Sequence, residues 1–354
     1  MRGYDTGRYL LALGYGETTS RLDIVTPHPP LRAPSPNGRR ARPQFVVAMS
    51  KREMPIDPHR SRLPLEKRYA LLGVVLIAPT VLILCAVIVY PLMSAIYMSF
   101  FSIYTPTLKA TWVGLDNYIN VLGSRGFWNA LATTCIWTAG TLFVQIVFGV
   151  AMALLLNQNI LFRSLARSLV LFPYFVSTVV AVLIWRWLFN DLYGILSHLL
   201  IEAGIVSMPV DWLGRMPNAM TSVIFVGAWK FFPFVVIAVL ARLQTIPEQL
   251  YEAATIDGAG VFGRFFDVTL PQLKDVLGIV ILLRTIWDFK EFDLIYLLTG
   301  GGPVNNTRTL PLIVYQQAFG LNQMGVAATY AVAMMLVMLV FMLLYLYRAR
   351  RVAA

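Results

Sequence analysis

The sequence predicts an all-α protein that crosses a membrane several times. Apolar residue types make up 58% of the 354 residues, whereas charged types make up only 13%. An ordinary soluble domain has about 25% charged residues. The chain also contains six long apolar runs. These features exclude a soluble globular protein and a disordered chain, and they predict a polytopic membrane protein with six transmembrane helices.

Each apolar run is long enough to cross the hydrocarbon core of a bilayer, which takes roughly 20 residues of helix. The runs cover residues 70–90, 130–156, 168–188, 219–241, 276–299 and 325–347. Pro91 closes the first run, and the fourth run contains Lys230 and Pro233. The fifth run is unusually rich in charged residues, so we expect it to face something other than lipid.

The positions of Lys and Arg near the runs predict the orientation, because these residues are enriched in cytoplasmic loops. If the N-terminus is cytoplasmic, the basic residues of most loops and of both ends fall on the inner side. The outer side then carries only Lys109, Arg125, Arg215 and Arg308. Both termini are therefore predicted to be cytoplasmic. We assign the net charge of +11 to contact with membrane lipid rather than with nucleic acid.

The first part of the chain differs from the rest. Residues 1–68 hold many Pro, Arg and Gly residues and no long apolar period, so we predict a disordered basic tail. The tail lacks the apolar segment of a signal peptide. Met49 opens a more ordinary basic start, and we expect translation to begin there. The transmembrane domain is predicted to cover residues 69–350.

The longest internal loop on the predicted cytoplasmic side covers residues 242–275. Thr245 and Glu248 match a capping box, which predicts a short helix over residues 246–256. Gly258 is suited to the positive φ that often ends a helix, and a second helical stretch is expected to lead back to the membrane. The pattern predicts a helix-turn-helix on the membrane surface. An ordinary amphipathic interfacial loop fits the same residues.

The charged residues of the fifth run are costly at membrane depth, at about 2.5–3.5 kcal/mol each on insertion scales. Helical spacing places four of its residues on one face. That face comprises Arg284, Trp287, Asp288 and Glu291. Lys290 and Asp293 form a separate pair. We expect the first face to look into the bundle interior or a water-filled cavity. An internal salt-bridge network that only braces the bundle is the alternative.

The cytoplasmic loop resembles the EAA loop of binding-protein-dependent ABC importer permeases. Glu252-Ala253-Ala254 is followed by Gly258 and then by Val268-Thr269-Leu270-Pro271. This spacing matches the family pattern, with Val268 in the place of isoleucine. The resemblance implies a type I ABC importer permease fold, with a permease domain over residues 69–350.

Other segments resemble the carbohydrate importer subfamily. They cover residues 177–190, 229–260 and 286–303. The LLTGGGP sequence at the end of the fifth run is similar to the maltose-type first permease subunit. In this family, the loop docks on a cytoplasmic ATPase subunit. The resemblance thus assigns ATPase coupling to Glu252, Ala253, Ala254, Asp257 and Gly258. Glu252 would contact the ATPase, and Gly258 would permit the turn.

The resemblance also implies a sugar site on the fourth and fifth runs. Its expected residues are Lys230, Phe231, Phe234, Arg284, Trp287, Asp288 and Glu291. Where the maltose permease has small or amide groups, this chain has charged ones, so the identity of the sugar stays open. Carboxylate and guanidinium groups can hydrogen-bond to hydroxyls, and Trp287 can stack on a pyranose ring.

The resemblance finally implies the role of the chain in a larger assembly. The chain would be the permease subunit of a bacterial ABC importer in the plasma (inner) membrane, moving a carbohydrate by alternating access. The expected partners are a homologous second permease, two ATP-binding cassette subunits and an extracytoplasmic sugar-binding protein.

We do not expect the chain to be an enzyme. The phosphate-binding pattern GxxxxGK[ST] is missing from the sequence, so ATP and Mg are expected on the partner ATPase and no cofactor is expected on this chain. The three histidines are scattered, so no metal site is expected. The alternative is a proton-coupled secondary transporter that uses the acidic residues of the fifth run.

Overall fold

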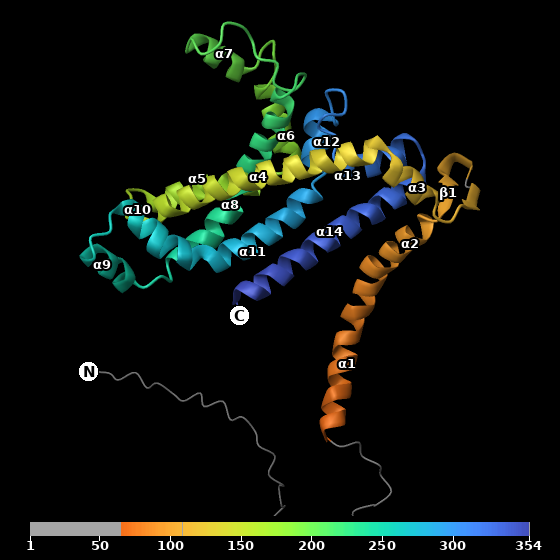
Figure 1. Cartoon of the computed structure of the whole chain (residues 1–354), viewed down its shortest axis with the longest axis horizontal. Helices are drawn as coiled ribbons and strands as arrows, with labels where there is room; N and C mark the ends of the chain where they lie inside the picture. Colours follow the sequence, from red (N-terminus) through yellow and green to blue (C-terminus); the bar gives the residue numbers. More distant parts are fainter. Residues whose placement is uncertain (1–64, 108, 354) are drawn as a thin grey trace, which may run out of the picture. The chain divides into compact units, whose positions relative to one another are not determined.

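The computed structural model describes residues 65–107 and 109–353 (Figure 1). The predicted tail, with its expected start at Met49, lies outside the described residues, except that residues 65–68 open the first helix.

The described part is mostly helical. Its α-helices are α1 (Leu65–Leu84), α2 (Tyr90–Met98), α3 (Asp116–Gly123), α4 (Arg125–Asn157), α5 (Arg163–Phe175), α6 (Thr178–Leu188), α7 (Ile195–Glu202), α8 (Asn218–Leu243), α9 (Glu248–Ile256), α10 (Val261–Gly263), α11 (Leu270–Phe289), α12 (Asp293–Thr299), α13 (Leu310–Tyr315) and α14 (Met324–Ala353). The π-helical segments η1 (Cys85–Val89) and η3 (Arg264–Thr269) join successive helices, and the π-helical segment η4 (Gln316–Gly320) extends α13. The segment η2 (Thr105–Thr107) is a 3₁₀ turn.

Four helical segments among the described residues are long and apolar enough to cross a membrane. They are Tyr69–Met98, Arg125–Asn157, Asn218–Leu243 and Met324–Arg348. These segments coincide with the first, second, fourth and sixth predicted runs. The total of six spans and the orientation of the termini stay predictions.

The third predicted run, residues 168–188, is not one straight helix. It is divided between α5 and α6, which meet at an angle of 96°. Pro173 lies in the last turn of α5, where its ring and missing N–H weaken the helix. Val176 and Ser177 then adopt ψ angles of 135° and 139°, which end helical geometry. Figure 1 shows α6 turning away from α5 at this point. The bent pair forms a fifth span only if it crosses as one unit.

The fifth predicted run is also interrupted, so a single helix over residues 276–299 is wrong. α11 ends at Phe289, and α12 begins at Asp293 after a short non-helical break. The break is stabilised from within, because the Glu291 carboxylate accepts a hydrogen bond from the Leu294 N–H at 3.1 Å. Such a bond satisfies a backbone donor that the start of a helix leaves free.

A short β-hairpin follows α2 and was not expected from the apolar pattern. β1 (Phe101–Tyr104) pairs antiparallel with β2 (Lys109–Trp112), with Phe101 opposite Trp112. The start of α14 lies against this hairpin. A Cβ atom at Gly325 would come within 1.8 Å of the Phe101 carbonyl oxygen, so only glycine fits there.

The core of the membrane part is the packing of α4 along α8. A Cβ at Gly227 would lie 2.2 Å from the Trp137 ring, and one at Gly149 would lie 2.6 Å from the Val235 Cβ. Small residues at such contacts let membrane helices approach closely. Trp137 is fully buried at this interface.

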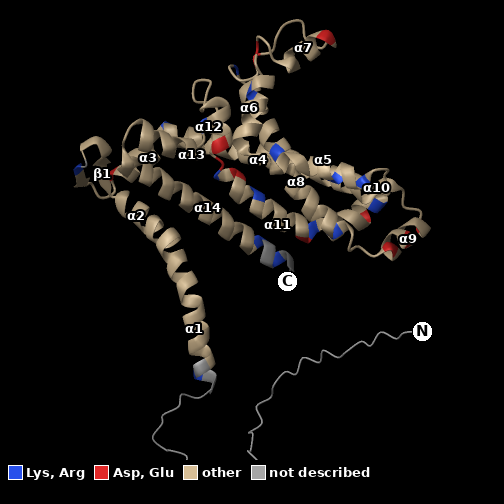
Figure 2. Ribbon diagram, turned by 180° about the vertical axis from the view of Figure 1, so that it is seen from behind, with Lys and Arg blue, Asp and Glu red and all other residues tan. Residues whose placement is uncertain are grey.

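By contrast, most of α1 and α2 is exposed, although residues 94–96 of α2 are half-buried. No residue in the most apolar window of Tyr69–Met98 is buried within the described chain. Figure 2 shows no charged residue on these helices beyond the start of α1. An apolar surface of this extent must be covered by lipid or by protein.

Replacing Gly227 by alanine is expected to lower the thermal unfolding midpoint, although alanine is the better helix former. The methyl group would collide with the Trp137 ring, which a hydrogen bond from its Nε1 to the Asp288 carbonyl oxygen holds at 2.8 Å. Overpacking of this kind costs about 1–3 kcal/mol. The measurement is thermal unfolding of the detergent-purified protein.

Gly73→Ala is the matched control, because no atom lies within 4 Å of a Cβ at that helical position. Its midpoint should equal that of the wild type or lie slightly above it, because alanine favours the helix and meets no neighbour. An unchanged midpoint for Gly227→Ala would contradict the close packing of α4 on α8.

Candidate functional site

Three polar side chains form a closed hydrogen-bonded network between α4 and α11. The Arg284 Nε donates to Gln145 Oε1 at 2.8 Å, and its Nη2 donates to Asp288 Oδ1. Gln145 Nε2 completes the ring by donating to Asp288 Oδ2 at 3.3 Å. The three residues are 0%, 2% and 1% exposed for Gln145, Arg284 and Asp288. Arg284 and Asp288, which helical spacing places on one face, therefore form a buried ion pair, as the alternative of an internal salt-bridge network expects.

Gln145 was not among the residues predicted from the sequence. The sequence did offer a sign of it, because Gln145 is the one side-chain amide in the middle of the uncharged second run. Trp137, two turns earlier on α4, also binds α11 by donating to the Asp288 carbonyl oxygen. Two residues of α4 thus hold the last turn of α11 in place.

A cavity of about 370 Å³ lies beside this network. Its walls combine aromatic rings with charged groups. They are formed by Tyr174, Phe231, Arg284, Trp287, Asp288, Lys290, Glu291, Phe292 and Asp293. The structure thus brings together five of the seven residues expected for a sugar site.

The aromatic walls of the cavity are organised around the Arg284 guanidinium. Its Cζ lies 4.5 Å from the centre of the Phe231 ring and 5.7 Å from that of Trp287. Such cation–π contacts hold both rings without consuming the hydrogen-bonding groups of the site. Phe234 packs edge-on against Trp287 at 5.0 Å and supports it from outside the cavity lining.

Lys230 does not line the cavity. It is 3% exposed, and its ammonium donates to the Val176 carbonyl oxygen at 2.6 Å, at the break between α5 and α6.

Glu291 follows the end of α11 and caps α12, so it does not continue the helical face of Arg284 and Asp288 as predicted. The predicted pair of Lys290 and Asp293 is not formed either. Across residues 65–107 and 109–353, Arg284 and Asp288 form the one Arg–carboxylate ion pair, and His198 lies 4.0 Å from Glu202. The reason is the helix break, which changes the spacing on which both predictions relied.

The loop over residues 242–275 forms a helix-turn-helix, as predicted. α9 ends in a Schellman motif, in which Ala259 N–H bonds to the Ala254 carbonyl and Gly258 N–H bonds to the Thr255 carbonyl. Gly258 has a φ of +82°, as its predicted C-cap role requires. After the turn, α10 and η3 lead without interruption into α11.

The predicted capping box is wrong. The Thr245 hydroxyl donates to the Arg242 carbonyl oxygen at 2.8 Å instead of capping α9. Pro247 takes the N-cap position, and α9 begins at Glu248. Thr245 lies two residues before the Pro247 N-cap, and its hydroxyl is engaged at the end of α8, where it also accepts a hydrogen bond from the Arg242 Nη1 at 3.3 Å.

Side-chain bonds fix this loop to the membrane helices. Arg242 at the end of α8 donates through Nε and Nη2 to the carbonyl and side-chain oxygens of Gln272, each at 2.9 Å. The Tyr251 and Thr269 hydroxyls lie 3.1 Å apart, which holds α9 against η3. The loop is thereby tied to both α8 and α11.

The tip of the loop is exposed. Among the expected coupling residues, Glu252, Ala253, Asp257 and Gly258 are exposed and Ala254 is half-buried. Exposed apolar side chains flank the Gly258 turn. They are Ile256, Val261 and Phe262. An exposed cluster of this kind, beside a carboxylate, has the composition of a protein-binding surface.

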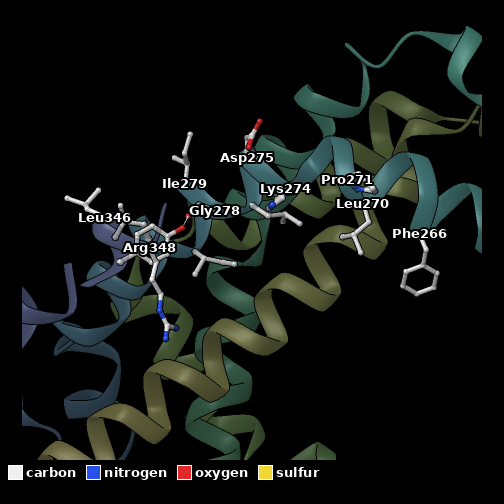
Figure 3. Close-up of a pocket in the computed structure, with 13 residues that line it drawn as sticks. Phe266, Leu270, Pro271, Lys274, Asp275, Gly278, Ile279, Leu346 and Arg348 are labelled. Carbon is white, nitrogen blue, oxygen red and sulfur yellow. Dashed lines mark hydrogen bonds between the residues drawn. The ribbon is translucent and has the colours of Figure 1, made fainter. Parts of the chain in front are cut away.

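A larger groove of about 960 Å³ lies between α11 and α14 and is mainly apolar (Figure 3). Lys274, Asp275 and Arg348 are its charged lining residues. None of the residues expected to bind sugar lines this groove.

Comparisons with known proteins agree with these features. A family model described as "Binding-protein-dependent transport system inner membrane component" matches residues 145–354. The trehalose/maltose transport system permease protein MalF of Thermococcus litoralis is 35% identical over 282 residues, covering 80% of this chain and 95% of the relative. The inner membrane ABC transporter permease protein YcjO of Escherichia coli is 36% identical over 280 residues, covering 78% and 93%.

Solved structures share the fold. A bacterial ABC transporter involved in the import of the acidic polysaccharide alginate matches with a TM-score of 0.71 at 22% identity, covering 81% of this chain and 98% of that chain. A structure of the alginate transporter in complex with a periplasmic protein bound to an alginate pentasaccharide matches with a TM-score of 0.69 at 22% identity, covering 81% and 96%. From the family match and the extent of these likenesses, the chain belongs to the family of binding-protein-dependent transport system inner membrane components.

Proposed function

We propose that this chain is the permease subunit of an ABC importer that moves a carbohydrate across the inner membrane. The observation that carries the proposal is the combination of family membership with a relative named for trehalose and maltose transport. The chain would change between inward-open and outward-open states as ATP is hydrolysed on separate subunits. A secondary transporter is not favoured, because the family is named for dependence on a binding protein.

The 370 Å³ cavity is the proposed sugar site. Its size and its mixture of rings and charged groups suit a ligand that presents hydroxyls and flat apolar faces. We assign sugar contact to Phe231, Trp287 and Glu291, supported by Phe234 behind Trp287. Arg284 and Asp288 are hydrogen-bonded to each other, so their main role would be to shape the site. Only the donors and acceptors that this pair leaves free could bond to the sugar.

The tip of the loop at α9 is the proposed ATPase contact. Glu252 would supply the charged contact, Ala253, Ala254 and Asp257 the adjoining surface, and Gly258 the turn. Because Arg242 and Tyr251 hold the loop to α8 and α11, a push on α9 would reach the helices that border the cavity. The partners in this proposal are two ATPase subunits, a second homologous permease and an extracytoplasmic sugar-binding protein. ATP and Mg would be bound on the ATPases.

The proposal is tested by reconstituting the chain with the ATPase, second permease and binding protein of its own system. ATP hydrolysis and uptake are then measured with trehalose, maltose, an alginate oligosaccharide and an amino acid. We expect at least one sugar to stimulate both activities. Stimulation by the amino acid alone, or uptake driven by a proton gradient without ATP, would overturn the proposal.

Gly258→Pro should uncouple uptake from ATP hydrolysis. Proline cannot adopt the φ of +82° and lacks the N–H that bonds to the Thr255 carbonyl, so the turn after α9 is lost. We expect the protein still to insert into the membrane, whereas sugar uptake should fall by about tenfold or more. This matches the cost of a strained backbone conformation, which is about 1–3 kcal/mol. Uptake in proteoliposomes is compared with ATP hydrolysis.

The matched control for this loop is Gly260→Ala, two residues away. Gly260 has a φ of −69°, and no atom lies within 4 Å of a Cβ there, so alanine should be accepted. Normal coupled uptake in Gly258→Pro would contradict the coupling role of the turn.

Two isosteric changes separate a sugar site from a structural brace. Asp288→Asn leaves the buried Arg284 without a counter-charge, and breaking such a pair costs about 3–5 kcal/mol, so the thermal midpoint should fall. Glu291→Gln removes charge from the cavity but keeps an acceptor for the Leu294 N–H, so the midpoint should hold while the KM for sugar rises. If Glu291→Gln instead lowers the midpoint and leaves KM unchanged, the acidic groups only brace the bundle.

A further inference from the structure

The bend between α5 and α6 leaves main-chain groups without helical partners. The last four carbonyls of any α-helix lack an intrahelical donor. In a bilayer no water is at hand to replace it, so a break in a membrane helix survives only where another group satisfies the freed backbone. At this bend the Val176 carbonyl is one such acceptor, because Val176 is the extended residue that follows α5.

Lys230 on α8 supplies the missing donor. Its ammonium bonds to the Val176 carbonyl oxygen at 2.6 Å, and no other hydrogen bond or ion pair of this ammonium exists within the described residues. The residue is buried, and buried charges are normally paired with opposite charge. A lysine placed here and bound to a carbonyl therefore serves the main chain at the break.

Both residues joined by this hydrogen bond lie close in sequence to residues that line the proposed sugar cavity. Tyr174, two residues before Val176, lines the cavity, and so does Phe231, which follows Lys230. The Lys230 ammonium lies 5.4 Å from the centre of the Phe231 ring, which the Arg284 guanidinium also contacts. A change in the bend would thus move an aromatic wall of the cavity.

We propose that Lys230 is a positioning residue that fixes the α5–α6 bend and so places Tyr174 in the wall of the sugar cavity. The inference rests on the proposed function for its link to sugar, whereas the role at the bend stands on the structure. It revises the expectation that Lys230 itself touches the sugar.

The bend is measured directly by pulsed electron spin resonance in the assembled transporter. Spin labels are placed at Leu169→Cys on α5 and Leu183→Cys on α6, both exposed positions, with Cys85 and Cys135 replaced by serine. Lys230→Met, which keeps the length of the side chain and removes the donor, should broaden and shift the distance distribution. Lys230→Arg, which keeps a charged donor, should restore it.

Lys290→Met is the matched control, because Lys290 lines the cavity but has no contact with the bend. Its distance distribution should match that of the spin-labelled protein that keeps both Lys230 and Lys290. If Lys230→Met does not assemble, Lys230→Gln takes its place, since the shorter amide cannot reach the carbonyl. An unchanged distance distribution in Lys230→Met or Lys230→Gln overturns the proposal.

Transport kinetics distinguish a positioning role of Lys230 from direct contact of Lys230 with the sugar. With trehalose and maltose as probes, Lys230→Met should raise the KM by about tenfold or more and change kcat less, since a hydrogen bond to a charged group is lost from the support of the site. A raised KM with an unchanged distance distribution would mean that Lys230 contacts the sugar, which also overturns the proposal. If neither sugar acts on the wild type, the proposed function fails for these sugars, while the spectroscopic arm still decides the role at the bend.

Discussion

The buried network of Gln145, Arg284 and Asp288 is the interaction on which the rest of the membrane part depends. A guanidinium and a carboxylate inside a helix bundle are tolerable only when each is neutralised and hydrogen-bonded. Here that requirement is met across two helices, because Gln145 on α4 bonds to both charged groups of α11. The end of α11 is thereby held at one position against α4, and Trp137 adds a main-chain bond at the same place. This network therefore also fixes the cavity wall to which Arg284 and Asp288 belong.

Helix α8 connects the α5–α6 bend and the exposed loop to the helices that carry this network. Its glycine at position 227 lets Trp137 approach, its Lys230 binds the break between α5 and α6, and its last turn holds Gln272 through Arg242. The same helix therefore contacts the core, the bend and the exposed loop. Since packed helices move as rigid bodies rather than bending continuously, a displacement of the loop would be transmitted along α8 and α11 together.

Two interruptions of helices give the cavity its chemistry. Tyr174, at the end of α5 just before the bend, lines the cavity, and so do Lys290, Glu291 and Asp293 at the break after α11. Both interruptions expose backbone groups, and each is stabilised by a side chain, namely Lys230 at the first and Glu291 at the second. Irregular backbone at membrane depth is expected where it lines a cavity or is buried in protein.

The sequence alone determined the features that depend on local composition and spacing. Hydropathy predicted the four apolar helical segments, and the glycine after α9 predicted the left-handed turn, because each needs only neighbouring residues. The face of Arg284, Trp287 and Asp288 was likewise predictable from helical spacing, but its continuation to Glu291 was not, since a break changes the spacing. Tertiary structure alone decided which groups meet. Gln145 lies 139 residues before Arg284, and Lys230 finds its acceptor 54 residues away. No local pattern encodes such pairings, because they follow from how the helices pack and from the cost of leaving a buried polar group unpaired.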